Sequence, residues 1–171
     1  MNQTELERPA CGKVFTTNFK RFRNTWELVP NAMWFGVTRY PMWKRGKGPD
    51  ANWRRTIIAW MPELAPSREL LKKKKRGEIE WVDFITCYLE EIQSNPKSLR
   101  LLQEIAHCVA AGRDVVLMCF ENKGEKCHRY ELAELLYKLV RQKQSELYGC
   151  MYRLGSPKGG ELCVSLPHQE G

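Results

Sequence analysis

Three apolar segments of the chain have the pattern of β-strands. Residues 115–120 form a continuous apolar run between Asp114 and Glu121, and such runs are typical of central strands that are covered on both faces. Residues 13–19 are rich in β-branched and aromatic side chains, which favour strands. Residues 32–39 form another short apolar run, which Pro41 stops because proline cannot donate to a sheet ladder. These three segments are predicted strands.

Apolar residues recur at helical spacing in three longer segments, residues 81–92, 99–110 and 128–143. The first two are separated by Asn95 and Pro96, which break a helix. A shorter helix is expected to begin after Ser67, a residue that can cap it, and to end before Gly77. Each of the three long patterns predicts an amphipathic helix that packs against a core.

The order of strands and helices predicts the fold class. A strand, a helix and another strand in succession favour a mainly parallel, Rossmann-like sheet flanked by helices in one α/β domain. Residues 13–154 are the predicted domain, residues 1–12 a flexible N-terminal arm and residues 155–171 a flexible C-terminal tail, within which 161–166 could add an edge strand. Residues 42–62 are expected to be a long loop with at most short structured pieces, because glycine and proline interrupt them.

Composition agrees with one intracellular domain. The chain has 171 residues, 43% of them hydrophobic, which is enough for a core without a disulfide or metal. No segment approaches the roughly 20 apolar residues that cross a bilayer, and the first residues lack the order of a secretion signal. The seven cysteines are an odd number without the paired spacings of a zinc ribbon or disulfide framework. We therefore expect a cytoplasmic protein with free thiols and no membrane partner.

The net charge of +8 favours an anionic partner, although it serves solubility equally well. A candidate site for that partner lies around the end of the strand at residues 115–120. Cys119, Glu121 and Arg39 fall at strand carboxyl ends, and residues 127–129, Cys-His-Arg, open the next helix. Ligands of open α/β sheets bind at this edge. A helix N-terminus also attracts phosphates and carboxylates.

The residues at this turn suggest specific roles. Arg39, Lys126 and Arg129 are the predicted anion-binding residues. Cys127 is the predicted nucleophile, because a helix N-terminus and nearby cations lower the pKa of a thiol. His128 could act as general acid or base.

The two remaining polar groups of the turn are predicted to take part in catalysis as well. Glu121 could orient His128 or serve as base itself, and Cys119 completes the catalytic candidates. Neighbouring residues of a helix point apart, so a direct hydrogen bond between Cys127 and His128 is not expected.

Other interpretations of the same residues remain open. Cys119 could be a buried strand residue, and Glu121 could only cap the loop or pair with Arg39. A zinc ion on Cys119, Cys127 and His128 would need a fourth ligand, and the spacing is not that of a zinc finger, so no metal site is predicted. A redox disulfide between the two cysteines requires Cα atoms within about 7 Å.

Several motifs together resemble the domain of unknown function 488 (DUF488) family. The signature of that family is a hydrophobic strand ending in Cys-x-Glu, followed by Cys-His-Arg at a helix start, as in residues 115–121 and 127–129 here. Further matching segments are residues 39–41, 64–67 with a preceding tryptophan, and 75–79 with Phe84 and Tyr88. The resemblance covers roughly residues 13–143. Where the family usually has an aspartate before Arg39, this chain has Gly-Val-Thr. The resemblance implies a compact three-layer α/β domain and supplies no reaction.

Two functional hypotheses follow, with the cofactor and oligomeric state left open. The first is an enzyme that acts on a nucleotide or another phosphorylated small molecule at the Cys119–Arg129 turn. The second is a nucleic-acid-binding module that uses basic and tryptophan-rich segments. Its candidate residues are Lys72, Lys73, Lys74, Lys75, Arg76, Trp43 and Trp53. An interaction protein without chemistry is a third reading, which no residue specifically favours.

Overall fold

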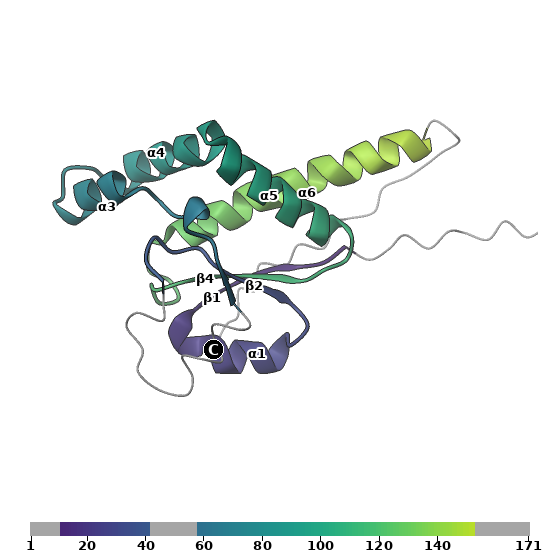
Figure 1. Cartoon of the computed structure of the whole chain (residues 1–171), viewed down its shortest axis with the longest axis horizontal. Coiled ribbons are helices and arrows are strands. Elements are labelled where there is room, and N and C mark those ends of the chain that lie inside the picture. Colours follow the sequence, from purple (N-terminus) through teal and green to yellow (C-terminus); the bar gives the residue numbers. More distant parts are fainter. Residues whose placement is uncertain (1–10, 42–57, 153–171) are drawn as a thin grey trace, which may run out of the picture.

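The computed structural model describes residues 11–41 and 58–152 of the chain (Figure 1). Their strands form one four-stranded parallel sheet in the order β1-β4-β2-β3. The elements in chain order are β1 (Val14–Asn18), η1 (Phe19–Arg21), α1 (Phe22–Leu28), β2 (Met33–Gly36), β3 (Ile58–Trp60), η3 (Pro62–Leu64), α3 (Arg68–Lys75), α4 (Trp81–Ser94), α5 (Pro96–Ala110), β4 (Val115–Cys119) and α6 (His128–Tyr152).

Strand β4 is the central strand, as its apolar sequence predicts. It pairs with β1 on one side and with β2 on the other, so that Val115 lies opposite both Val14 and Met33. All five of its side chains are buried. Because successive strand residues face opposite sides, Leu117 belongs to one hydrophobic cluster and Met118 to the other.

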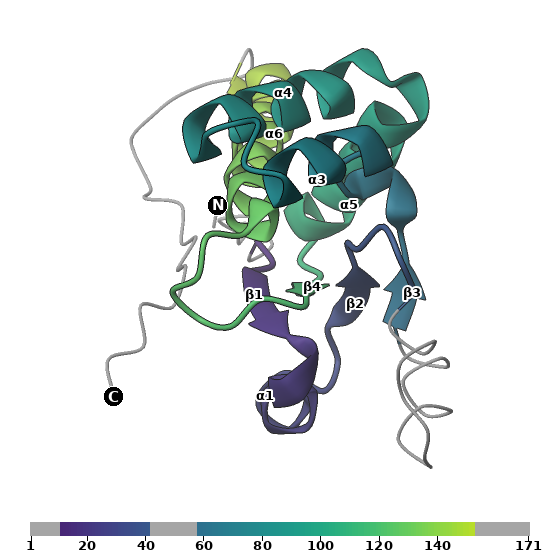
Figure 2. The same ribbon diagram turned by 90° about the vertical axis from the view of Figure 1, so that its left-hand side faces the viewer.

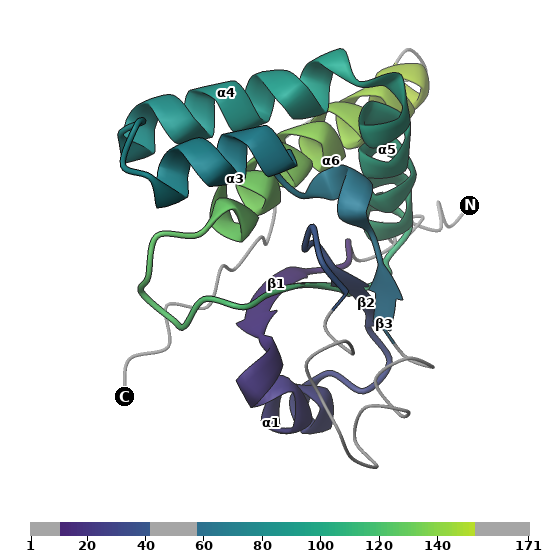
Figure 3. The same cartoon turned by 60° about the vertical axis from the view of Figure 1, so that its left-hand side comes forward.

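The two clusters divide the protein into three layers (Figures 2 and 3). Helices α3, α4, α5 and α6 cover one face of the sheet, where Phe84, Leu102 and Leu132 join the larger cluster. The short helix α1 lies on the other face, where Phe22 and Trp34 pack in the smaller cluster. The predicted parallel α/β domain with flanking helices is confirmed.

The predicted cap of α3 is confirmed, and the predicted break at Asn95 and Pro96 is the start of α5. The Ser67 side chain accepts a hydrogen bond from the amide of Leu70 at 3.1 Å and caps α3. Asn95 caps α5 in the same way, and Pro96 occupies the first helical position, where its missing amide hydrogen costs nothing. Local chemistry therefore sets both starts.

The structure adds to the sequence-based boundaries at three places. Helix α1 was not predicted, and β3 is a short structured piece of the kind that the predicted loop of residues 42–62 allowed. Both are short, seven and three residues, so their apolar periodicity is weak. Helix α6 continues to Tyr152, beyond the predicted end at residue 143. Residues 42–57, nearly all of the predicted arm and the predicted tail lie outside the described residues. None of the described helices is long and apolar enough to span a membrane.

Replacing Leu117 by alanine should weaken the domain strongly. Leu117 is fully buried in the larger cluster, and removing a buried leucine side chain costs about 2–5 kcal/mol of unfolding free energy. Urea denaturation followed by circular dichroism measures this loss. The control is Val82→Ala on α4, where the side chain is 74% exposed and the expected change is within about 0.5 kcal/mol. Equal midpoints for the two variants would contradict the assigned core.

Candidate active site

The predicted catalytic residues meet at the carboxyl edge of the sheet. Strand β4 ends at Cys119, and the following loop leads into α6, whose first residue is His128 (Figure 3). The neighbouring strand β2 ends at Gly36, so that Val37 lies against the start of α6, where its carbonyl oxygen is 2.7 Å from His128 Nε2. The parallel topology brings these segments together, as expected for strands whose carboxyl ends share one edge.

One carboxylate oxygen connects the two cysteines. Glu121 Oε2 lies 2.8 Å from Cys119 Sγ and 3.2 Å from Cys127 Sγ. Both sulfurs are buried, since Cys119 is 2% and Cys127 1% exposed, whereas Glu121 is partly exposed. Burial raises the pKa of Glu121, but hydrogen bonds from the two thiols outweigh it and the net pKa is lowered. Glu121 is therefore an ionised carboxylate that accepts hydrogen bonds from the neighbouring thiols.

The two thiols differ in acidity. A hydrogen bond from Cys119 lowers the pKa of Cys127 to about 6, with burial opposing and His128 assisting. The same hydrogen bond, together with burial, raises the pKa of Cys119 far above its ordinary value. A sulfur that accepts a hydrogen bond as an anion is stabilised in that form. Of the two sulfurs, Cys127 is therefore the more acidic.

His128 presents an unprotonated ring nitrogen to Cys127. Its Nε2 lies 2.7 Å from the carbonyl oxygen of Val37, and because a carbonyl only accepts, Nε2 carries the hydrogen in the neutral ring. Nδ1, which is then an acceptor, lies 4.0 Å from Cys127 Sγ. The two neighbouring side chains thus come within the outer limit of a sulfur hydrogen bond, closer than their adjacency in a helix suggests.

Tyr88 holds the imidazole in place and is a site residue that sequence reasoning did not assign. Its ring contacts the His128 ring edge to face at 5.2 Å. Its hydroxyl donates to the carbonyl of Leu64 at 2.8 Å. Burial, followed by the nearby sulfurs, raises the pKa of Tyr88 well above its usual value, so this group stays neutral. The helical spacing of Tyr88 gives only a core position, and no local signal identifies its contact.

Arg129 is buried and organises the turn from inside. It is 2% exposed, and its guanidinium donates to the carbonyls of Glu121 at 2.7 Å and Asn122 at 3.2 Å. It also contacts the Tyr130 hydroxyl at 2.7 Å, and Nη1 lies 3.6 Å from Cys127 Sγ. Within the described ranges no carboxylate forms an ion pair with it. A buried cation without a counter-charge is costly, so Arg129 favours the thiolate form of Cys127.

The other predicted anion-binding residues have different surroundings. Arg39 donates to the carbonyls of Pro66 at 2.9 Å and Ala65 at 2.6 Å, where it holds the segment before α3. It forms no ion pair with Glu121. Lys126 is exposed beside Cys127. The structure therefore places two of the three cations on backbone carbonyls and leaves Lys126 facing solvent.

The predicted nucleic-acid residues that the structure describes belong to another element. Lys72, Lys73, Lys74 and Lys75 lie on α3, and Arg76 ends it. Lys74 packs over the rings of Trp81 and Phe84 at 4.5 and 4.8 Å, whereas the other four side chains are exposed. Trp43 and Trp53 lie outside the described residues. The proposed pairing of these tryptophans with the basic helix remains a prediction.

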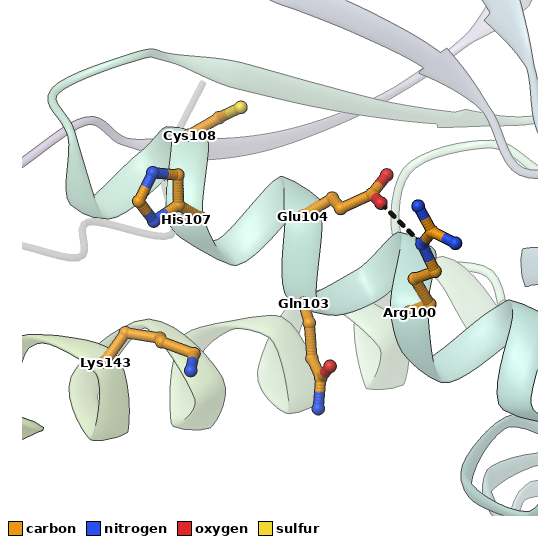
Figure 4. Close-up of a pocket in the computed structure, with 6 residues that line it drawn as sticks. All are labelled: Arg100, Gln103, Glu104, His107, Cys108 and Lys143. Carbon is orange, nitrogen blue, oxygen red and sulfur yellow. Dashed lines mark hydrogen bonds and ion pairs between the residues drawn. The ribbon is translucent and has the colours of Figure 1, made fainter.

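Two further features could bind ligands. Ligand atoms of Cys119, Cys127 and His128 lie within 4.8 Å of one another, which is the geometry that a soft cation could use, with Glu121 or water as fourth ligand. A separate surface pocket lies between α5 and α6 (Figure 4). It is lined by Arg100, Gln103, Glu104, His107, Cys108 and Lys143. No predicted site residue borders it, so the chemistry of the turn does not extend there.

A comparison with protein families matches residues 23–139 to the model DUF488-N3a, described as the active DUF488-N3 subclade. The matched segment is more than half of the chain and includes α1, β2, β3, β4 and the first half of α6. It contains the whole Cys-x-Glu and Cys-His-Arg turn. Searches of curated proteins and of solved structures found no match.

The pH dependence of the alkylation of Cys127 by iodoacetamide should be that of an acidic thiol. The rate should rise with pH around a midpoint near 6, against about 8.5 for an ordinary cysteine, because only the thiolate reacts. Cys119→Ala removes the main hydrogen-bond donor and should raise this midpoint. Cys119→Ser keeps a donor and should hold it low. Peptide mass spectrometry follows the reaction, and a wild-type midpoint near 8.5, or equal midpoints for both variants, would refute the assignment.

Proposed function

The chain belongs to the DUF488 family, and on that premise we propose that it is a cysteine-dependent enzyme that acts on a nucleotide or another anionic small molecule. One observation carries the proposal. Cys127 Sγ lies near the Arg129 guanidinium and His128 Nδ1, and hydrogen bonds with Cys119 and His128 lower its pKa to about 6 although burial and the Glu121 carboxylate oppose this. A thiol made acidic by its neighbours is the usual form of a catalytic cysteine.

The residues of the turn have complementary roles in such a reaction. The thiolate sulfur of Cys127 bonds to the electrophilic atom of the substrate, while the bond from that atom to the leaving group breaks. The proton that Cys127 gave up is held by His128 at Nδ1, 4.0 Å away, and passes to the leaving group, which departs with the electron pair. Water then cleaves the covalent intermediate with Glu121 as base, which restores the thiol.

The anionic substrate class rests on the charge around the turn. Arg129 and the N-terminus of α6 supply positive potential at Cys127. Lys126 is exposed and can contact an anionic group directly. Glu121 is partly exposed whereas both cysteines are buried, so substrate approaches from the side of Glu121. Because Lys126 precedes Cys127 in the chain, an anion that it binds is held at the same turn as the nucleophile.

A nucleic-acid-binding module is the second candidate. The exposed side chains of Lys72, Lys73, Lys75 and Arg76 on α3 give one face a high positive charge. Such a face attracts phosphates without reading sequence. It uses none of the chemistry of Cys127, so the two candidates predict different variants to matter.

Phosphate or a nucleotide should raise the thermal unfolding midpoint and slow the alkylation of Cys127, because a ligand that binds only the folded state stabilises it. A panel of phosphate, nucleoside mono-, di- and triphosphates and a single-stranded oligonucleotide tests this by scanning fluorimetry and peptide mass spectrometry. Lys126→Ala should weaken the protection several-fold, whereas Lys73→Ala should leave it intact.

The opposite pattern would overturn the enzyme proposal. In that pattern no small anion protects Cys127, and only the oligonucleotide shifts the midpoint, in a salt-dependent way that Lys73→Ala abolishes. The basic face of α3 would then be the functional surface, because phosphate contacts release counterions and weaken with salt.

A further inference from the structure

We infer that Cys119 and Cys127 form a redox-active dithiol, in which Cys127 reduces a hydroperoxide and Cys119 resolves the product as a disulfide. The inference rests on the proposed role of Cys127 as nucleophile and adds a second substrate class to the same centre. It also gives Cys119, which the group-transfer reaction uses only as a hydrogen-bond donor, a covalent role of its own.

The geometry of the two sulfurs carries the inference. Both lie against the same oxygen of Glu121, at 2.8 and 3.2 Å, and within 4.8 Å of each other. One belongs to the last residue of β4 and the other to the residue before α6. A disulfide needs a separation of about 2.05 Å, so the two sulfurs must move toward each other for the bond to form.

The surroundings assign the attacking and the resolving cysteine. Cys127 faces the Arg129 guanidinium, which stabilises an anionic sulfur, and His128 Nδ1, which can take up the proton that the sulfur loses. Cys119 has neither contact and donates to the Glu121 carboxylate. In a dithiol pair the more acidic sulfur attacks first, as the thiolate, and the other thiol then attacks the product.

The first step oxidises Cys127. Its thiolate sulfur attacks one peroxide oxygen, an S–O bond forms and the O–O bond breaks. The departing oxygen takes the bonding electrons and the proton that Cys127 had given to His128. The products are a sulfenic acid at Cys127 and water or an alcohol, so the sulfur loses two electrons and the peroxide gains them.

The second step uses Cys119 as the resolving thiol. Its proton moves to Glu121 Oε2 at 2.8 Å, and its sulfur attacks the sulfenic sulfur of Cys127. The S–S bond forms as the S–O bond breaks, and the departing hydroxide takes the proton from Glu121 to leave as water. An external dithiol reductant then returns both cysteines to thiols by exchange.

The substrate class follows from access to the sulfurs. Cys119 and Cys127 are 2% and 1% exposed, and the partly exposed Glu121 is the member of the centre that meets solvent. A hydroperoxide such as hydrogen peroxide is nearly as small as water, so of the reagents that could oxidise such a sulfur it needs the least opening of the centre. The oxidised pair holds the nucleophile in a bond, so peroxide also switches off the group-transfer reaction reversibly.

The test is a stoichiometric oxidation of the full chain, chelator-treated, reduced and freed of reductant. One equivalent of hydrogen peroxide should lower the intact mass by two hydrogens, and dithiothreitol should restore it. Trypsin cleaves after Lys123 and Lys126, between the two cysteines, so non-reducing peptide mapping should find the Cys119 and Cys127 peptides joined. In Cys119→Ser, dimedone should instead trap a sulfenic acid at Cys127. Cys87→Ser should behave as wild type.

Non-reducing peptide mapping of the wild-type chain tests the redox inference without depending on how any variant folds. If one equivalent leaves the two peptides unjoined, or joins Cys127 to another cysteine, the inference is wrong. If Cys127 alkylates with a low midpoint yet forms no disulfide with Cys119, the redox inference fails and the proposed nucleophile stands. If Cys127 alkylates as an ordinary thiol, the proposed function fails, and the redox inference with it.

Discussion

The candidate site depends on a buried arginine that has no carboxylate partner in the described chain. Arg129 donates hydrogen bonds to the carbonyls of Glu121 and Asn122, and so fixes the shape of the loop between β4 and α6. That shape in turn places the Glu121 carboxylate against both sulfurs. The charge of Arg129 still needs compensation in a low-dielectric surrounding. An anionic sulfur at Cys127, 3.6 Å away, supplies it, so Arg129 fixes the geometry of the turn and acts on Cys127 together with Cys119 and His128, which lower the pKa of that thiol.

The fold supplies the second constraint on the site. The carbonyl of Val37, which follows β2, accepts a hydrogen bond from His128 at the start of α6. The ring of Tyr88 on α4 packs against the imidazole, and its hydroxyl donates to the carbonyl of Leu64. The imidazole is therefore held between a strand end and a packed helix. The carbonyl of Val37, just after β2, sets the tautomer of His128. A change in the register of β2 would move this acceptor away from the ring. The parallel sheet thus determines the position and the tautomer of His128.

The sequence predicted those features that depend on neighbours along the chain. The apolar run of β4, the cap Ser67, the break at Asn95 and Pro96, and the position of the turn follow from local patterns. Contacts between distant residues gave no such signal. The hydrogen bond of His128 with Val37 spans 91 positions, and the bonds of Arg39 to carbonyls 26 and 27 positions away use a residue whose charge suggested a ligand. Short elements such as β3 were missed because three residues carry little periodicity.

The asymmetry of the two cysteines illustrates how position changes chemistry. Both are buried thiols that touch the same oxygen of Glu121, and in isolation they would titrate alike. Cys119 ends a strand and has the carboxylate and the other sulfur as its polar neighbours, both of which disfavour a negative charge. Cys127 precedes a helix, beside Arg129 and His128, which favour one. The different neighbours of the two sulfurs therefore give their pKa values opposite directions, and Cys127 is the sulfur that loses its proton more readily.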